Sequence, residues 1–197
     1  MTITKSLQYP LLALTISDKE CKHIMTPVLE GCLTKSHICH NFPRSVAYGP
    51  IAEKVLELSN IYTIKGLTQI SSIVQFLGET HHFTGKLLRA SIEVAKVEMD
   101  TGKDLFGCNY WKYECLLTKT WIKGVRKFLW KRNITLIEDK TTNLTLQQEN
   151  NTFIMEDIII MNMYSKAELQ HINRCRIYFQ ASTLSDIVTG DGNCFSY

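Results

Sequence analysis

Residues 119–132 read KTWIKGVRKFLWKR, and this stretch decides the fold class. Its apolar side chains Trp121, Val125 and Phe128 recur at the three- and four-residue spacing of one face of an α-helix. Cationic residues fill most of the other positions and no acidic residue is present. We therefore predict a helix over residues 111–132 that packs with one side and leaves a basic side exposed to solvent.

This basic side is the strongest indication of function. The whole chain of 197 residues carries only +3, so the residues outside 119–132 are acidic on balance. Lysine and arginine on one side of a helix can contact phosphates, and an indole at the edge can stack on a base. An ordinary solvated helix face explains the same pattern equally well. The predicted nucleic-acid-binding residues are Lys119, Lys123, Arg126, Lys127, Trp130 and Lys131.

Working outward, the rest of the chain also favours helices. Ser17 with Glu20 and Ser165 with Glu168 have the spacing of capping boxes, each followed by apolar residues at helical intervals. Gly102 is suited to end the helix before it, and Pro27 lies inside the first helix. Residues 134–137 and 144–146 could form a small hairpin. The further expected helices are residues 17–33, 62–79, 87–101, 151–163 (where a strand is the alternative) and 165–181.

A polar stripe on the last of these helices has two interpretations. Asn173, Arg176 and Gln180 share one side, opposite Ile172 and its apolar neighbours. Arg176 can pair with Asp186, which follows the helix. We favour a structural clamp made of Asn173, Arg176, Gln180 and Asp186 over a phosphate or template contact.

The sequence contains no motif typical of a catalytic or metal site. Cys32, His37, Cys39 and His40 do not have the spacing of a zinc finger. No G-x-S-x-G, P-loop, G-x-G-x-x-G or [FY]-x-D-D pattern occurs. We expect no catalytic residue, no metal and no cofactor in this chain. Seven cysteines without a C-x-x-C pair favour a reducing compartment, nuclear or cytoplasmic, and no apolar run reaches the ~20 residues of a membrane span.

Motifs spread over nearly the whole chain resemble one protein family. The C-terminal run NRCRIYFQ at residues 173–180 is followed by TLSDI at 183–187 and by Gly190-Asp191-Gly192. The N-terminal motifs are Tyr9-Pro10-Leu11, Cys21, Ile24-Met25, Pro43-Arg44, Tyr48-Gly49-Pro50, Tyr62 and Gly66. Together they are similar to the region after the polymerase core in reverse transcriptases of LINE-like retrotransposons.

The resemblance implies a helical thumb-like part at residues 1–101 and a connection-like part with the basic helix at 102–197. Such regions grip the primer–template duplex of RNA and DNA, while the polymerase palm holds Mg²⁺ and adds nucleotides. The implied partners are that duplex and the polymerase and ribonuclease H parts, with no membrane. We expect a fragment of a larger polymerase that is inactive alone. The alternative is a non-catalytic helical protein-interaction module with a basic face.

Overall fold

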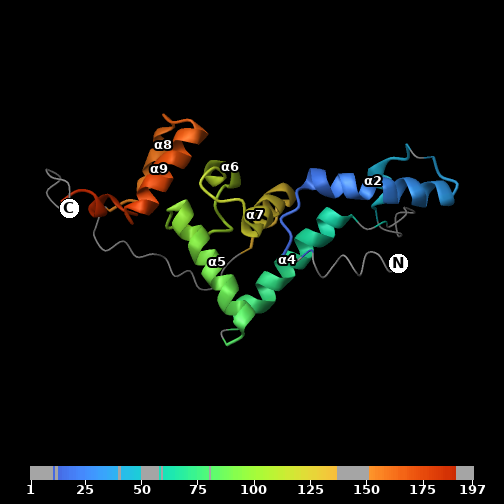
Figure 1. The fold of residues 1–197 in the computed structure, drawn as a ribbon, viewed down its shortest axis with the longest axis horizontal. Helices are drawn as coiled ribbons and strands as arrows, with labels where there is room; N and C mark the ends of the chain where they lie inside the picture. The colour runs from blue at the N-terminus through green and yellow to red at the C-terminus, as the bar shows by residue number, and fades with distance from the viewer. Residues whose placement is uncertain are drawn as a thin grey trace. The chain divides into compact units, whose positions relative to one another are not determined.

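A computed structural model describes residues 11, 13–39, 41–49, 58, 60–79, 81–136 and 151–189 of this chain. They form eight α-helices and one short 3-10 helix, and no strand, which confirms the predicted mainly helical fold (Figure 1). An isolated antiparallel bridge joins Phe153 and Thr183. The elements are α2 (Asp18–Lys35), α3 (Arg44–Ala47), α4 (Ile61–Gly78), α5 (Phe83–Met99), α6 (Tyr110–Tyr113), α7 (Trp121–Arg132), α8 (Ile154–Met161), α9 (Lys166–Tyr178) and η2 (Leu184–Asp186).

The chain divides into two compact units, Met1–Gly78 and Glu79–Tyr197. The boundary implied by the family resemblance, at residue 101, lies inside the second of these units. Helix α5 precedes residue 101 but contacts α7 and α9, which follow it. Residues on both sides of 101 therefore belong to one compact unit.

In the first unit, α2 packs against α4. Ser17 and Glu20 form the predicted capping box, which satisfies free N–H groups at the start of α2. The buried residues of α2 recur every four positions, from Cys21 to Leu33, while the apolar residues Ile24 and Val28 of the same helix are exposed. The buried stripe is therefore narrower than the apolar pattern of the sequence.

Two polar residues of α4 are buried in this unit. Lys65 Nζ donates a hydrogen bond to the carbonyl of Ile16 at 2.6 Å, and Gln69 Nε2 lies 3.3 Å from the carbonyls of Leu11 and Leu14. Burial lowers the pKa of Lys65. These bonds tie the segment before α2 to α4, since backbone carbonyls without secondary structure need other partners.

In the second unit, the helix predicted over residues 111–132 is broken into α6 and α7. The carboxylate of Glu98 accepts hydrogen bonds from both the backbone N–H and the hydroxyl of Thr118, at 3.0 and 3.2 Å. Thr120 then takes an extended conformation and becomes the N-cap of α7. A contact 20 residues away in the sequence therefore interrupts a continuous helical pattern.

The end of α5 also differs from the prediction. Asp100, and not Gly102, takes the left-handed conformation that ends this helix, with φ of 49°. Aspartate tolerates this region better than most residues do, and its carboxylate here has a buried cationic partner. Gly102 instead allows a close approach, because a Cβ there would lie 2.9 Å from the Phe153 ring.

This contact gives a prediction for Gly102→Ala. The added methyl group is expected to destabilise the second unit by about 1–3 kcal/mol, since the buried Phe153 ring must move. All three tryptophans of the chain lie in this unit, so urea unfolding followed by tryptophan fluorescence measures its stability. Gly31→Ala in α2 is the control, because a Cβ at Gly31 would have no atom within 4 Å and its unit has no tryptophan. An unchanged midpoint in Gly102→Ala would contradict the prediction.

Helices α8 and α9 pack against each other as an antiparallel pair. At the end away from their connecting turn, residues just before α8 contact residues just after α9. Helix α8 confirms the preferred helical interpretation of residues 151–163, and the Ser165–Glu168 capping box opens α9 as predicted. Asn151 and Ser185 exchange two hydrogen bonds, of 2.6 and 3.2 Å, beside the Phe153–Thr183 bridge. The predicted strand at 144–146 and the Gly190-Asp191-Gly192 motif lie outside the described residues.

Candidate nucleic-acid interface

Helix α7 carries the basic residues singled out in the sequence. Ile122, Val125, Phe128 and Leu129 are buried, which confirms that one side of the helix packs. On the other side, Lys119, Lys123, Lys127 and Lys131 follow one another at four-residue intervals, and we call these four residues the lysine row. Lys119 and Lys131 are exposed, whereas Lys123 and Lys127 are half-buried. The row therefore lies on the accessible side of α7.

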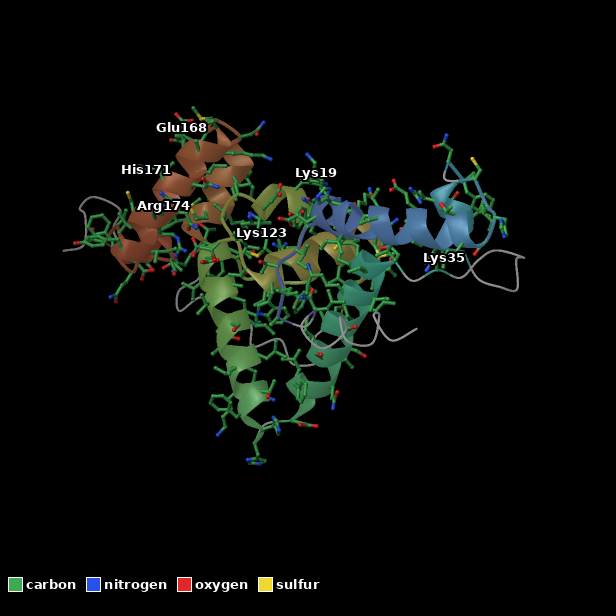
Figure 2. All side chains as sticks on the ribbon, turned by 45° about the vertical axis from the view of Figure 1, so that its right-hand side comes forward. Lys19, Lys35, Lys123, Glu168, His171 and Arg174 are labelled. Atoms are coloured by element: carbon green, nitrogen blue, oxygen red, sulfur yellow. The ribbon has the colours of Figure 1, made fainter. Side chains whose placement is uncertain are left out.

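One member of the lysine row is held in place by the protein. Lys123, which is labelled in Figure 2, donates a hydrogen bond from Nζ to the carbonyl of Leu117 at 3.1 Å. This bond joins α7 to the segment that precedes it. The ammonium group of Lys123 thus already has an acceptor, while Lys119 lies in the loop just before α7, within the same row.

Arg126 does not belong to the basic face that the sequence predicts. Its side chain is buried, with 3% of the residue exposed, and Nη2 donates to the carbonyl of Cys108 at 3.2 Å. The Tyr110 ring centroid lies 6.0 Å from its guanidinium carbon. Burial lowers the pKa of Arg126. The prediction of a surface phosphate contact here is wrong, because the long side chain folds inward from the edge of the packed face.

Trp130 lies at the margin between the packed and the basic sides. It is 41% exposed, so part of its indole is accessible, as a stacking surface for a base requires. Its remaining surface lines a pocket together with Arg126 and Leu129. Arg132, next to Lys131, places its guanidinium carbon 5.9 Å from the centroid of the Phe128 ring.

The predicted clamp on α9 exists, but with a different acid. Arg176 Nη1 lies 3.2 Å from Oδ1 of Asp100, and both side chains are buried. Arg176 does not pair with Asp186, whose carboxylate instead accepts N–H bonds from Ser182 and Thr183 at 2.8 and 2.7 Å. The pairing predicted for Arg176 is therefore wrong, because Asp186 is already used to cap η2.

The other clamp residues complete this arrangement. Arg176 also donates to Asn173 Oδ1, to the carbonyls of Ala181 and Val97 and to Ser182 Oγ. Asn173 Nδ2 donates to the carbonyl of Glu98 at 2.8 Å. Gln180, with φ of 55°, is exposed beyond the end of α9. Asn173 and Arg176 are therefore structural residues, and Gln180 lies apart from them.

Asp100 is the residue of this cluster that sequence reasoning missed. Its carboxylate also accepts the backbone N–H of Met155, in the first turn of α8, at 2.9 Å. Burial raises the pKa of Asp100 to about 6, against the opposing effects of that bond and of Arg176. No local pattern marks an aspartate whose partners lie 55 and 76 residues away.

Helix α9 presents its polar side to the core and much of its apolar side to solvent. Asn173 and Arg176 are buried, while Ile177 and Phe179 are exposed. Glu168, His171 and Arg174 occupy another exposed side of the same helix (Figure 2). The buried side of α9 consists of Leu169, Asn173 and Arg176, so hydrogen bonds from the two polar residues hold this side inward together with one buried leucine.

The described residues include no group of three or more His, Cys, Asp or Glu side chains placed to hold a metal ion. His40, one of the four residues considered for zinc, lies outside them. None of the helices in the same part of the chain is both long and apolar enough to cross a bilayer. Comparison of the chain with protein-family models, curated proteins and solved structures finds no match.

Proposed function

We propose that this chain is a non-catalytic part of a retrotransposon reverse transcriptase that grips primer–template nucleic acid, and that the lysine row contacts the phosphates. The observation that carries this proposal is the row itself. Lys123, Lys127 and Lys131 span about 12 Å along α7, and a DNA strand presents about four phosphates over this length. Helix α7 contains no acidic residue that would repel the phosphates.

The chemistry of the row favours binding without sequence preference. A lysine ammonium is a compact point charge that meets phosphate without the fixed geometry of a guanidinium. Phosphate contacts position a duplex but do not read its bases. With Arg126 buried, the accessible side of α7 presents lysines and the edge of Trp130. Such a surface suits a template whose sequence changes as synthesis proceeds.

Removing three charges from the row tests this proposal. We expect the triple variant Lys119→Gln, Lys127→Gln, Lys131→Gln to bind an RNA–DNA primer–template duplex roughly tenfold or more weakly at low salt. The slope of log K against log salt concentration should decrease by about 2–3, because three phosphate contacts are lost. Filter binding over a salt series measures both quantities.

The matched control removes the same charge from the other unit. Lys19, Lys22 and Lys35 are exposed on α2, so Lys19→Gln, Lys22→Gln, Lys35→Gln changes the net charge equally. Figure 2 labels Lys19 and Lys35 on this helix. This control is expected to keep both the affinity and the salt slope. Equal losses in the two triple variants, or no detectable binding by the unmodified chain at low salt, would contradict the proposed role of the row.

Exposed apolar side chains at the two ends of α9 favour a second candidate, a helical protein-interaction module. Met161, Met163, Tyr178 and Phe179 on and beside α8 and α9 are each more than half exposed. Methionine and aromatic side chains are enriched at protein interfaces. Capture of a protein partner that persists after nuclease treatment, together with an intact partner affinity in the lysine triple variant, would favour this candidate.

A further inference from the structure

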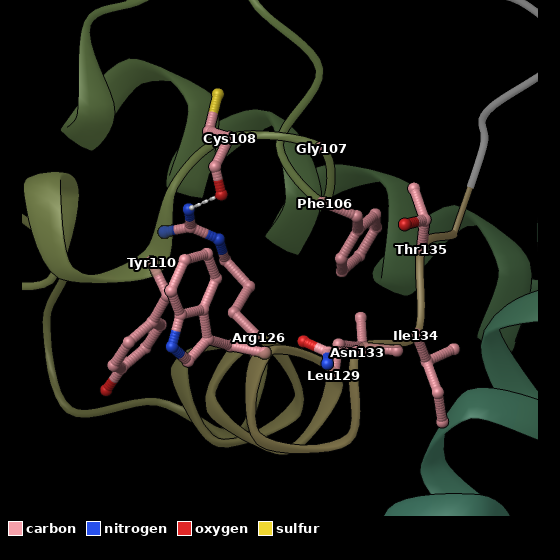
Figure 3. A pocket seen from close by; sticks show the side chains of 10 residues that line it. Phe106, Gly107, Cys108, Tyr110, Arg126, Leu129, Asn133, Ile134 and Thr135 are labelled. Atoms are coloured by element: carbon pink, nitrogen blue, oxygen red, sulfur yellow. Dashed lines mark hydrogen bonds between the residues drawn. The ribbon is translucent and has the colours of Figure 1, made fainter.

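A pocket of about 210 Å³ lies beside the carboxyl end of α7, within the second unit (Figure 3). The segment before α6 supplies Phe106, α6 supplies Tyr110, and α7 supplies Arg126 and Trp130. Ile134 and its neighbours just after α7 complete the wall. The lysine row does not line this pocket, so its chemistry is separate from the proposed phosphate contacts.

Arg126 is the unusual group of this pocket. Its guanidinium has five N–H donors, yet within the described residues its one hydrogen bond is that to the carbonyl of Cys108. Its Nη1 is buried without a hydrogen-bond partner there. No carboxylate of those residues forms an ion pair with it, and Asp104, the acid just before this segment, accepts the N–H groups of Phe106 and Gly107.

The second buried arginine shows what this site lacks. Arg176 has a carboxylate, two carbonyls and two side-chain oxygens around its guanidinium. A buried charge is costly unless it is paired and hydrogen-bonded. Arg176 meets both conditions, whereas Arg126, within the described part of the chain, lacks an ion-pair partner and an acceptor for Nη1. An anionic oxygen ligand would supply both to Arg126.

We propose that this pocket binds a small organic anion, whose carboxylate or phosphate head pairs with Arg126 and whose flat apolar body lies against the aromatic walls. Phe106, Tyr110 and Trp130 provide ring surfaces, and Leu129 and Ile134 provide aliphatic ones. The carbonyls of Leu129 and Trp130 at the end of α7 accept hydrogen bonds from the N–H groups of Ile134 and Asn133. These bonds compensate part of the negative partial charge on the two carbonyl oxygens.

The pocket volume sets the size of the ligand. Drug-sized ligands occupy about 300–1,000 Å³, and this pocket is smaller. A single ring with one acidic group is therefore the appropriate class. A guanidinium group can form two parallel hydrogen bonds either with a carboxylate or with a phosphate monoester. Benzoate and phenyl phosphate represent the two heads on one body.

The test measures binding of three probes by quenching of tryptophan fluorescence and by the shift in melting temperature. Benzoate and phenyl phosphate are expected to bind saturably, and benzamide, which keeps the ring but carries no charge, is expected to bind at least tenfold more weakly. The stronger of the two anions identifies the preferred head. The full chain is used throughout.

Two variants separate charge from shape. Arg126→Met removes the positive charge but retains an unbranched side chain of similar length. Binding of the preferred anion should fall at least tenfold. Ile134→Trp keeps Arg126 and fills the pocket from an exposed position, so it should also abolish binding even if Arg126→Met does not fold. Lys86→Gln is the control, because it removes an exposed charge on α5 of the same unit that does not line the pocket, and its affinity for the probe should be unchanged.

Three results would overturn the proposal. The first is the absence of saturable binding of either anion to the unmodified chain at millimolar concentration. The second is equal affinity for benzamide, which would assign the binding to the apolar walls alone. The third is unchanged affinity in a folded Arg126→Met variant, or in Ile134→Trp, which would place the anion elsewhere on the protein.

Discussion

Replacing Arg176 with methionine is expected to lower the free energy of unfolding of the second unit by about 3–5 kcal/mol. The change leaves the carboxylate of Asp100 buried without its cation and removes hydrogen bonds to the carbonyls of Val97 and Ala181. Burial of a charge without its partner costs far more than loss of a solvent-exposed ion pair. Urea unfolding followed by tryptophan fluorescence provides the measurement.

Arg174→Met is the matched control for this experiment. Arg174 lies two residues earlier on α9 and is exposed (Figure 2). The same substitution there should change stability by no more than about 0.5 kcal/mol. If Arg176→Met and Arg174→Met unfold at the same urea concentration, the Asp100–Arg176 pair does not hold α9 to α5.

The second large effect concerns pH and Asp100. Its pKa is raised by burial to about 6, from an ordinary value of 3.8. The folded state therefore keeps the proton over a pH range in which the unfolded chain has released it. This contribution to stability is fully present below pH 3.8 and is lost as the pH rises through about 6. The loss amounts to roughly 3 kcal/mol between pH 3.5 and 7.

Other carboxyl groups of the unit titrate with the opposite sign. Burial opposes the shift at Asp186, but hydrogen bonds from Thr183 and Ser182 lower its pKa, and the Ser165 hydroxyl lowers the pKa of Glu168. These groups favour the folded state as the pH rises. A comparison of the unmodified chain with Asp100→Asn isolates the contribution of Asp100, since asparagine also tolerates the left-handed backbone there.

The expected result is a change in the stability difference between the two proteins. The unmodified chain should lose stability relative to Asp100→Asn as the pH rises from 4 to 7, when each is unfolded in urea at a series of pH values. A stability difference that is constant over this range would show that Asp100 has the same pKa in the folded and the unfolded states.

Local signals made the helices predictable. The capping boxes at Ser17 and Ser165 involve only neighbouring residues, so each start could be predicted and each is confirmed. The packed side of α7 was predictable for the same reason. The break before α7 was not, because it depends on the carboxylate of Glu98, which belongs to another helix.

The errors at the candidate site have one physical origin. Arg126 and Arg176 are both long cations on helices with an apolar side, and the sequence does not show which carbonyl or carboxylate comes close to either one. The Cys108 carbonyl draws Arg126 inward, and Asp100 pairs with Arg176 across 76 residues of chain. Spacing along a helix predicts which residues share a side, but not which side chains reach past its edge.

The inward polar side of α9 has a consequence for the precision with which this helix is seated. An interface of aliphatic side chains tolerates small rotations and shifts, because dispersion contacts have little directional preference. The bonds from Asn173 to the Glu98 carbonyl and from Arg176 to the Val97 carbonyl are directional, and they meet the last turn of α5 at consecutive residues. A rotation of α9 by a single residue would break both at once. The carbonyls of Val97 and Glu98 therefore allow α9 to pack against α5 in one register only.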